Sequence, residues 1–375
     1  MSARETFIRN LTNFRGWRTN RRIVVFESDD WGSIRMPSKS AYETLLKKGI
    51  RVDQSRYDSL DSLEKEEDLS MLLQVLSDVK AYSGKKPVFT LNTVMTNPDF
   101  DRIKSNSFEY FYKESLFDSY RRYYGTDLKE IWTQGVKEGL IYPQFHAREH
   151  LNASLWLKDL QNGHRETLDA FNAGFFGLKT KTSSSIQRHY LAAYHAESEK
   201  DLQLLGQVSE EGLSLFKDTF GFSSKSFIAC NYVWPSVLEA RLQTAGVQYL
   251  QGQRVQKAPD TKSGKINGIK HFTGQRNSHG QIFLVRNAIF EPYKNKDYDW
   301  VRSCLAEISN AFFWGKPAII SSHRINYVSN MDKPHRDRNL RMLTDLLKQA
   351  VKRWPEVEFI STEQLGDLIL ETKSF

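Results

Sequence analysis

Two short segments of the sequence place acidic and imidazole side chains at the ends of apolar runs. Residues 27–32 read ESDDWG and directly follow the apolar run 23–26. Adjacent carboxylates such as Asp29 and Asp30 repel each other unless a cation or a shared proton relieves them. His146 and His150 follow a second such run, and two imidazoles four positions apart can converge on one ion. The two segments together predict a mononuclear metal site with a spare carboxylate beside it.

The residue types also indicate what such a site could do. Asp30, His146 and His150 would supply one oxygen and two nitrogens and leave a position open, as in catalytic zinc sites. Zinc lowers the pKa of its bound water, which can then attack a carbonyl carbon. Asp29 could accept a proton as general base, and His323 could protonate the leaving amine or alkoxide. Zinc is favoured by the nitrogen-rich set, although cobalt, nickel or iron would fit the same ligands.

The elements that must position these residues follow from the hydrophobic pattern. Strands are expected at 23–26, 87–91, 141–145, 226–230, 247–250, 281–285, 317–321 and 357–360. Helices are expected at 42–48, 66–82, 152–160, 201–220, 235–245, 299–313 and 340–353. Strands that alternate with helices predict a parallel sheet, and about seven such units without a linker predict an α/β fold, a distorted (β/α)7-type barrel of mostly parallel strands.

We expect a single domain over 1–375. An inserted helical, aromatic-rich segment at about 101–140 would lie over the site, and the polar stretch 257–280 would form an exposed loop or hairpin. The carboxyl ends of parallel strands share one face of a barrel. Four polar sets fall at such ends, and their common placement favours one site: Asp29 with Asp30, His146 with His150, Asn231, and Ser322 with His323.

These motifs resemble those of the polysaccharide deacetylase family, carbohydrate esterases with a distorted barrel of parallel strands. The family's first motif, Thr-Phe-Asp-Asp-Gly, is matched by 26–32, which implies Asp29 as the base and Asp30 as a metal ligand. A His-x-x-x-His motif implies metal ligation by His146 and His150. A late strand ending in Leu-x-His implies His323 as the acid. The similarity runs in order along most of the chain, through short motifs.

The chain departs from the family at two places. Trp31 separates Asp30 from Gly32, which alters the turn after the first motif. The family's third motif, Arg-x-Pro-Tyr, should follow the strand ending at residue 230, but 231–235 reads NYVWP and contains no arginine. Arg148 and Arg286 are the candidates to replace it. These departures indicate a divergent member.

Five residues near the motifs are expected to contact substrate. Trp31 could stack on a sugar ring, and an arginine can hold a carboxylate in a bidentate pair. Core packing of the ring and a strand-end ion pair are the competing interpretations. The set comprises Trp31, Asn92, Arg148, Asn231 and Arg286. Cys230 also lies at a strand end, but no histidine close in sequence supports it as a nucleophile.

Composition narrows the class of protein. The 375 residues carry 53 Lys+Arg against 45 Asp+Glu, a net charge of +8, but the basic residues are scattered, so a mixed solvated surface is favoured over a nucleic-acid partner. Two cysteines do not make a disulfide scaffold. The N-terminus lacks an apolar signal core and no apolar run is long enough to span a membrane, so we expect a cytoplasmic protein.

We therefore predict a hydrolase that uses a divalent metal, zinc by preference, to remove an acyl group from a carbohydrate substrate. The group expected is N-acetyl, and the substrate is an amino sugar or a glycan. Two alternatives stay open. One is a glycan-active hydrolase acting on a glycosidic bond or on a non-sugar amide. The other is a non-catalytic carbohydrate- or nucleic-acid-binding protein. The sequence indicates neither the particular sugar nor the oligomeric state.

Overall fold

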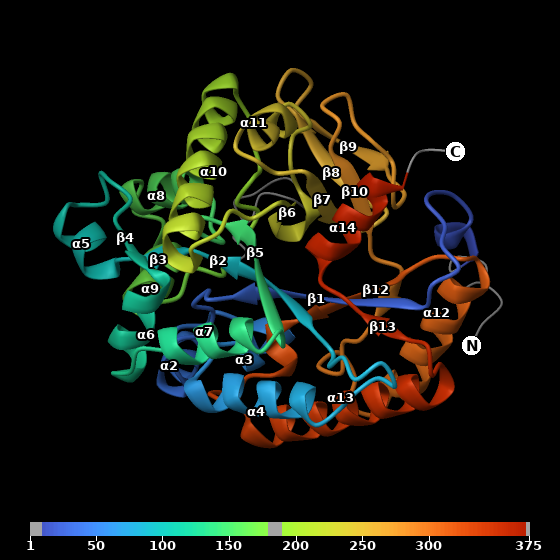
Figure 1. The fold of residues 1–375 in the computed structure, drawn as a ribbon. Coiled ribbons are helices and arrows are strands. Elements are labelled where there is room, and N and C mark those ends of the chain that lie inside the picture. The colour runs from blue at the N-terminus through green and yellow to red at the C-terminus, as the bar shows by residue number, and fades with distance from the viewer. Residues whose placement is uncertain (1–9, 179–189, 373–375) are drawn as a thin grey trace.

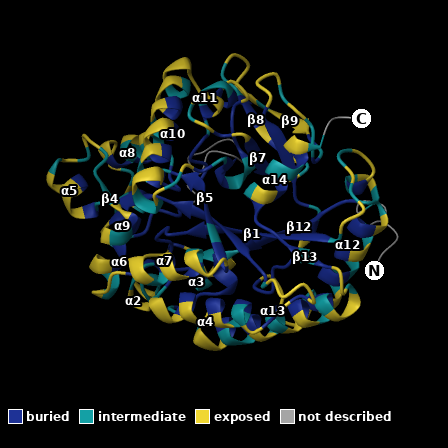
Figure 2. Cartoon of the chain, in the orientation of Figure 1, coloured by how far each residue is buried: buried dark blue, intermediate teal, exposed yellow. Residues whose placement is uncertain are grey.

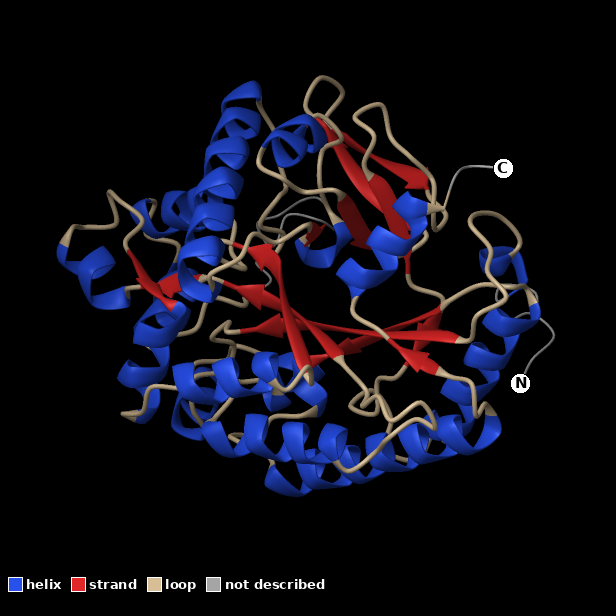
Figure 3. Ribbon diagram, in the orientation of Figure 1, coloured by secondary structure: helices blue, strands red, loops and turns tan. Residues whose placement is uncertain are grey.

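A curled sheet of parallel strands forms the centre of the molecule, and helices pack around it (Figures 1 and 3). The computed structural model describes residues 10–178 and 190–372. The sheet order is β10-β7-β6-β5-β2-β1-β12-β11, with β13 also paired to β1, and all of these pairs are parallel. The strands are β1 (Ile23–Trp31), β2 (Phe89–Val94), β5 (Ile141–Ala147), β6 (Ser226–Ile228), β7 (Tyr249–Gly252), β10 (Ile282–Val285), β11 (Ala288–Ile289), β12 (Ala318–His323) and β13 (Glu358–Phe359). The fold is the predicted α/β distorted barrel.

The two edges of the sheet are joined by a link of two residues. β10 and β11 lie at opposite ends of the strand order, yet only Arg286 and Asn287 separate them in sequence. The Arg286 N–H donates to the Gly252 carbonyl at 2.9 Å, and the Asn287 N–H donates to the Ile319 carbonyl at 3.0 Å. The link is therefore hydrogen-bonded to β7 on one side and to β12 on the other, and the chain itself closes the barrel.

The outer layer consists of amphipathic helices whose outward sides are exposed (Figure 2). α4 shows the cause, since Leu69, Leu72, Leu73 and Leu76 recur at helical spacing and are all buried. The helices are α2 (Lys39–Lys47), α3 (Arg56–Leu60), α4 (Glu66–Ser77), α5 (Phe100–Ser105), α6 (Leu116–Tyr124), α7 (Lys129–Lys137), α8 (Ala153–Gln161), α9 (Arg165–Asn172), α10 (Glu199–Phe220), α11 (Leu238–Thr244), α12 (Trp300–Phe313), α13 (Lys333–Arg353) and α14 (Thr362–Glu371), with 3-10 turns η1 (Val52–Gln54), η2 (Cys230–Tyr232) and η3 (Arg324–Asn326). Among these helices, none is long and apolar enough to cross a lipid bilayer.

β1 is the central strand, and all nine of its residues are buried. Its side chains alternate between two packing clusters, since Val24 and Phe26 belong to one cluster and Ile23 and Val25 to another. The second cluster also contains Ile282 and Leu284 of β10, from the far end of the strand order. Continuing this alternation places Glu27 and Asp29 on the inner face of the barrel, towards its carboxyl end.

Residues 101–140 and 257–280, which lie outside the alternation of parallel strands and helices, also form helices and strands. Residues 101–140 contain α6, α7 and most of α5, and β4 (Lys113–Ser115) pairs antiparallel with β3 (Thr96–Pro98). The stretch 257–280 contains most of an antiparallel hairpin, β8 (Val255–Asp260) and β9 (Lys265–Lys270). α13 begins at Lys333, seven residues before the expected start at 340, because the Asp332 side chain accepts from the His335 N–H as an N-cap.

Candidate active site

A break in the pairing of β1 allows two consecutive carboxylates to reach one pocket. Neighbouring residues of a regular strand point to opposite faces. Here the register between β1 and β2 shifts between Ser28 and Trp31, and Asp30 has a left-handed φ of 75°. Such a bulge re-aims a side chain at the end of a strand. Asp29 and Asp30 consequently both line the same pocket.

Trp31, which interrupts the family pattern, anchors this bulge in the core. Its indole is 0% exposed, its Nε1 donates to the Ser28 Oγ at 2.9 Å, and its ring stacks on Tyr327 with centroids 6.5 Å apart. The ring packs under the site and does not face the pocket in the part of the chain that the structure describes.

Asp30 lies close to both His146 and His150, as a shared metal ion would require. The Nε2 atoms of His146 and His150 lie 3.4 and 3.3 Å from the same oxygen, Oδ1 of Asp30. Two atoms bound tetrahedrally to zinc at about 2.1 Å would lie roughly 3.4 Å apart, so the spacing fits an ion of that size. The His146 Nδ1 lies 2.8 Å from the Ile228 carbonyl, and a protonated Nδ1 donating to it would leave Nε2 free as a ligand.

Asp29 is held by a bidentate ion pair. Arg286 donates from Nη1 and Nη2 to the two Asp29 oxygens at 2.8 and 2.6 Å, and its Nε donates to Glu27 at 2.7 Å. The Asn92 Nδ2 donates to Asp29 at 2.7 Å and to Gln251 at 2.9 Å. Burial alone would raise the pKa of Asp29, but the Arg286 guanidinium, together with the nearby His323 and His146, outweighs burial and lowers the pKa below its usual value. The carboxylate is therefore oriented and ionised at neutral pH.

Of the two arginines named as candidates to orient Asp29, Arg286 is the one that contacts it. Its side chain is 1% exposed and lies between Glu27 and Asp29, against β1. Arg148 points elsewhere, since its guanidinium pairs with Glu149 at 2.5 Å and with Glu211. The link that closes the barrel therefore also carries the guanidinium that orients the candidate base.

His323 lies beside Asp29 on the neighbouring strand β12 and has its own carboxylate partner. Its Nε2 lies 3.6 Å from the Asp29 Oδ2, while its Nδ1 is hydrogen-bonded to Glu291. Glu291 in turn accepts from the Asn326 Nδ2 at 2.8 Å. Burial lowers the pKa of His323, but Glu291, together with Asp29 and Asp30, outweighs burial and raises the pKa above the usual value. A carboxylate with a lowered pKa beside an imidazole with a raised pKa is the arrangement expected of a general base, here Asp29, and a general acid, here His323.

A change at Glu291 should therefore move the pH dependence of the reaction. In Glu291→Gln the neutral amide no longer favours the imidazolium, so the pKa of His323 should fall. Because an acid must be protonated to act, the basic limb of the kcat/KM profile should shift to lower pH. The matched control is Glu239→Gln. Glu239 is a buried carboxyl that is hydrogen-bonded to Trp234 and Asn277 outside the pocket, so its replacement should not shift the basic limb of the kcat/KM profile. An unmoved limb in Glu291→Gln would contradict an acid role for His323.

The structure brings most of the predicted site residues to one pocket of about 320 Å³, a volume typical of small-molecule sites. Asp29, Asp30, His146, His150, Asn231 and His323 line it. The Asn231 amide, however, donates to the Leu191 carbonyl at 2.8 Å. Asn92 and Arg286 contact Asp29, while Trp31 and Arg148 lie outside the lining in the described part of the chain.

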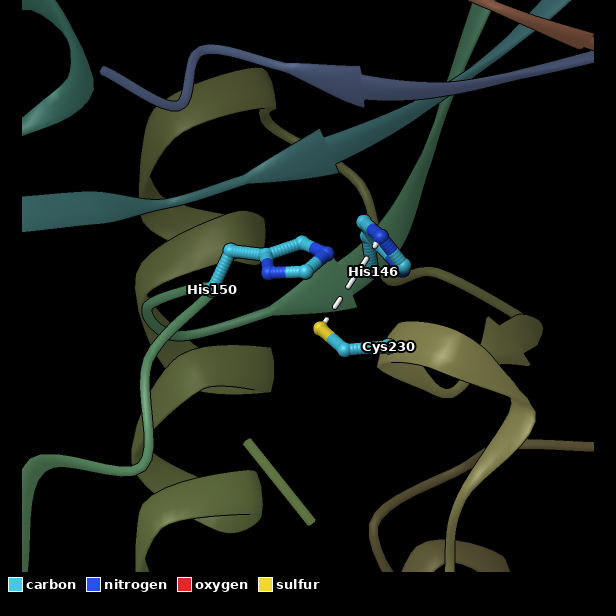
Figure 4. A group of neighbouring side chains, drawn as sticks. All are labelled: His146, His150 and Cys230. Atoms are coloured by element: carbon cyan, nitrogen blue, oxygen red, sulfur yellow. Dashed lines mark hydrogen bonds between the residues drawn. The ribbon is translucent and has the colours of Figure 1, made fainter. Parts of the chain in front are cut away.

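Cys230 lies beside the two histidines, a contact that the sequence did not indicate. Its Sγ lies 3.9 Å from the His146 Nε2, and ligand atoms of His146, His150 and Cys230 all fall within 4.8 Å of one another (Figure 4). Burial raises the pKa of the Cys230 thiol, but the two imidazoles outweigh it and lower the pKa to about 7. Its position at the end of a predicted strand was the one sign in the sequence that it could lie near the site. The histidine that it contacts is 84 positions away in the sequence.

No family model matches the chain, and no curated protein matches it either. Among solved structures it is similar to a probable polysaccharide deacetylase from Pseudomonas aeruginosa PAO1, with 10% identity, a TM-score of 0.48, and 95% of this chain and 93% of that chain covered. Puue allantoinase matches with 10% identity, a TM-score of 0.48, and 96% and 94% covered. A 4-alpha-glucanotransferase from Thermococcus litoralis matches with 8% identity, a TM-score of 0.44, and 94% and 41% covered. The type of protein that the motifs resemble is thus among these structures.

Proposed function

We propose that this chain is a metal-dependent hydrolase that removes an acyl group, N-acetyl by preference, from an amino sugar or glycan. One observation carries the proposal: Asp30, His146 and His150 converge at 3.3–3.4 Å beside a separate pair, Asp29 and His323, in one pocket. Three ligands, a base and an acid are the groups that metal-assisted acyl hydrolysis needs.

Each group has a task that its surroundings support. The chemistry that a divalent ion supplies when bound there is polarisation of a carbonyl and acidification of a water molecule. Asp29, ionised by its pair with Arg286, accepts the proton of the attacking water at a carboxylate oxygen. His323, kept protonated by Glu291, donates from Nε2 to the leaving nitrogen. Asn92 and Arg286 orient the base by donating to both of its oxygens.

The surroundings of Glu291 favour acyl hydrolysis over cleavage of a glycosidic bond. Glycosidases use two carboxyl groups that flank the scissile bond. Glu291, the pocket carboxylate beside His323, is 1% exposed and bonded to both His323 and Asn326. Its contacts support a role in holding the histidine. The opposed pKa shifts of Asp29 and His323 also support catalysis over simple binding.

The test is metal analysis of the purified protein followed by acetate release from a panel of N-acetylated amino sugars and their oligomers. We expect about one zinc per chain and acetate release that stops when a chelator strips the ion and returns when zinc is restored. Magnesium should not restore it, because nitrogen ligands disfavour that ion. His150→Ala should lose both metal and activity, whereas His279→Ala, a substitution on the exposed surface, should keep both.

Acetate release that persists in metal-free protein would contradict the proposal. So would a protein that holds zinc but releases acetate from no member of the panel. Release of reducing sugar without acetate would instead support the glycosidic alternative.

A further inference from the structure

We propose that Cys230 is a further ligand of the same ion, bound through its sulfur alongside His146 and His150. The inference rests on the metal site of the proposed function but not on the reaction. It changes the donor set from one oxygen and two nitrogens to four ligands that include a thiolate, so the water of the proposed reaction would take a fifth position on the ion.

The first support is distance. The Cys230 Sγ lies 3.9 Å from the His146 Nε2, and it groups with both histidines within 4.8 Å. A sulfur at about 2.3 Å and a nitrogen at about 2.0 Å from a tetrahedral zinc would be roughly 3.5 Å apart. The distance between the sulfur and the His146 Nε2 is therefore within a few tenths of an ångström of the value for two ligands of one ion, and His150 lies within 4.8 Å of both.

The second support is the backbone that presents the sulfur. Cys230 begins the turn η2 directly after β6, and Asn231 and Tyr232 both adopt left-handed conformations, with φ of 57° and 59°. Such conformations are uncommon in residues other than glycine. Figure 4 shows the result, since the side chains of His146, His150 and Cys230 point toward one another from separate segments.

The third support is burial, which separates a ligand from a nucleophile. Cys230 is 0% exposed and does not line the pocket in the described chain, whereas Asp30, His146 and His150 all do. A nucleophile must meet the substrate, but a ligand needs only to meet the ion. The sulfur is therefore placed to bind the ion from the protein side while the three other ligands border the pocket.

The chemical consequence is selectivity. A thiolate is a soft ligand that favours zinc and similar ions over magnesium, calcium or manganese. It also adds a negative charge to the carboxylate of Asp30, so the four side chains together would carry a charge of −2 that balances a divalent ion. The alternative is a cysteine that only fills the apolar cluster to which Cys230 also belongs.

The experiment compares the zinc and cobalt forms of the full chain. In the zinc form, X-ray absorption should detect one sulfur at about 2.3 Å together with nitrogen and oxygen at about 2.0–2.2 Å. In the cobalt form, a sulfur-to-metal charge-transfer band should appear in the near ultraviolet. The band should vanish in Cys230→Ala. It should persist in Cys304→Ala, the matched control, since Cys304 is also 0% exposed but lies on α12 within another cluster.

The outcomes distinguish this inference from the proposed function. Zinc bound by nitrogen and oxygen alone, with acetate release intact, would overturn the cysteine ligand and leave the hydrolase standing. A sulfur ligand found without hydrolysis would support the cysteine ligand and overturn the hydrolase. Failure to bind zinc or cobalt would overturn both the cysteine ligand and the hydrolase. A charge-transfer band that survives in Cys230→Ala would also refute the inference. If that variant does not fold, the absorption spectrum of the wild-type zinc form decides.

Discussion

Replacing Asp29 with asparagine is expected to lower kcat by about 10²- to 10⁴-fold, the range that a positioned general base contributes. The amide keeps the size of the side chain but cannot accept the proton. Zinc content should stay at the wild-type level, because the ligand is the neighbouring Asp30. Acetate release and metal analysis on the same preparation measure both quantities.

The control for this variant is Asp53→Asn, which removes a surface carboxylate paired with Arg51 at 2.7 Å. It should change neither kcat nor metal content. If Asp29→Asn loses its zinc, Asp29 is a ligand and the roles of Asp29 and Asp30 must be exchanged. If it keeps full activity, a general-base role for this carboxylate is ruled out.

Arg286→Gln is expected to have the largest effect on stability, with an activity loss beside it. Glu27 and the Arg286 side chain are 0% and 1% exposed, and Asp29 is almost as buried. Removing one partner of a buried ion pair typically costs about 3–5 kcal/mol, because the remaining charge is left without compensation. The free energy of unfolding from urea titration measures the loss. Activity should fall in the fraction that still folds, because Asp29 loses two of its three hydrogen bonds.

Two comparisons make this result specific. Arg21→Gln removes an exposed pair with Glu358 and should cost at most about 1 kcal/mol. The double variant Glu27→Gln with Arg286→Gln should recover part of the lost stability, because one of the two uncompensated carboxylates becomes neutral. A single variant as stable as the wild type would show that the guanidinium does not balance these charges.

The sequence was sufficient for the parts of the site that depend on strand ends. Asp29, Asp30, His146 and His323 each lie at the carboxyl end of a buried strand. In a parallel sheet those ends share one face, so apolar runs followed by polar residues predict proximity without any knowledge of loops. The barrel class followed from the same alternation.

The partners of these residues could not be predicted in the same way. Arg286 and Asp29 are 257 positions apart, and neither of the strands that flank Arg286, β10 and β11, pairs with β1. Glu291 meets His323 across 32 positions, outside any periodic pattern. Which arginine replaces the missing one depends on how the barrel closes, and closure is a property of the whole sheet. The bulge at Asp30 likewise has no signature in hydrophobic periodicity.

The link between β10 and β11 has a consequence for how this chain can vary. Only Arg286 and Asn287 join β10 to β11, and Arg286 also binds the candidate base Asp29. The length of this link is therefore set both by the strands that it joins and by the position of the guanidinium. An extra residue there would turn the guanidinium away from the carboxylate even if the strands still paired. The turn at 261–264 only joins β8 to β9 and does not hold a residue of the candidate site. Over evolutionary time, insertions and deletions should therefore accumulate in that turn and be rare in the link between β10 and β11.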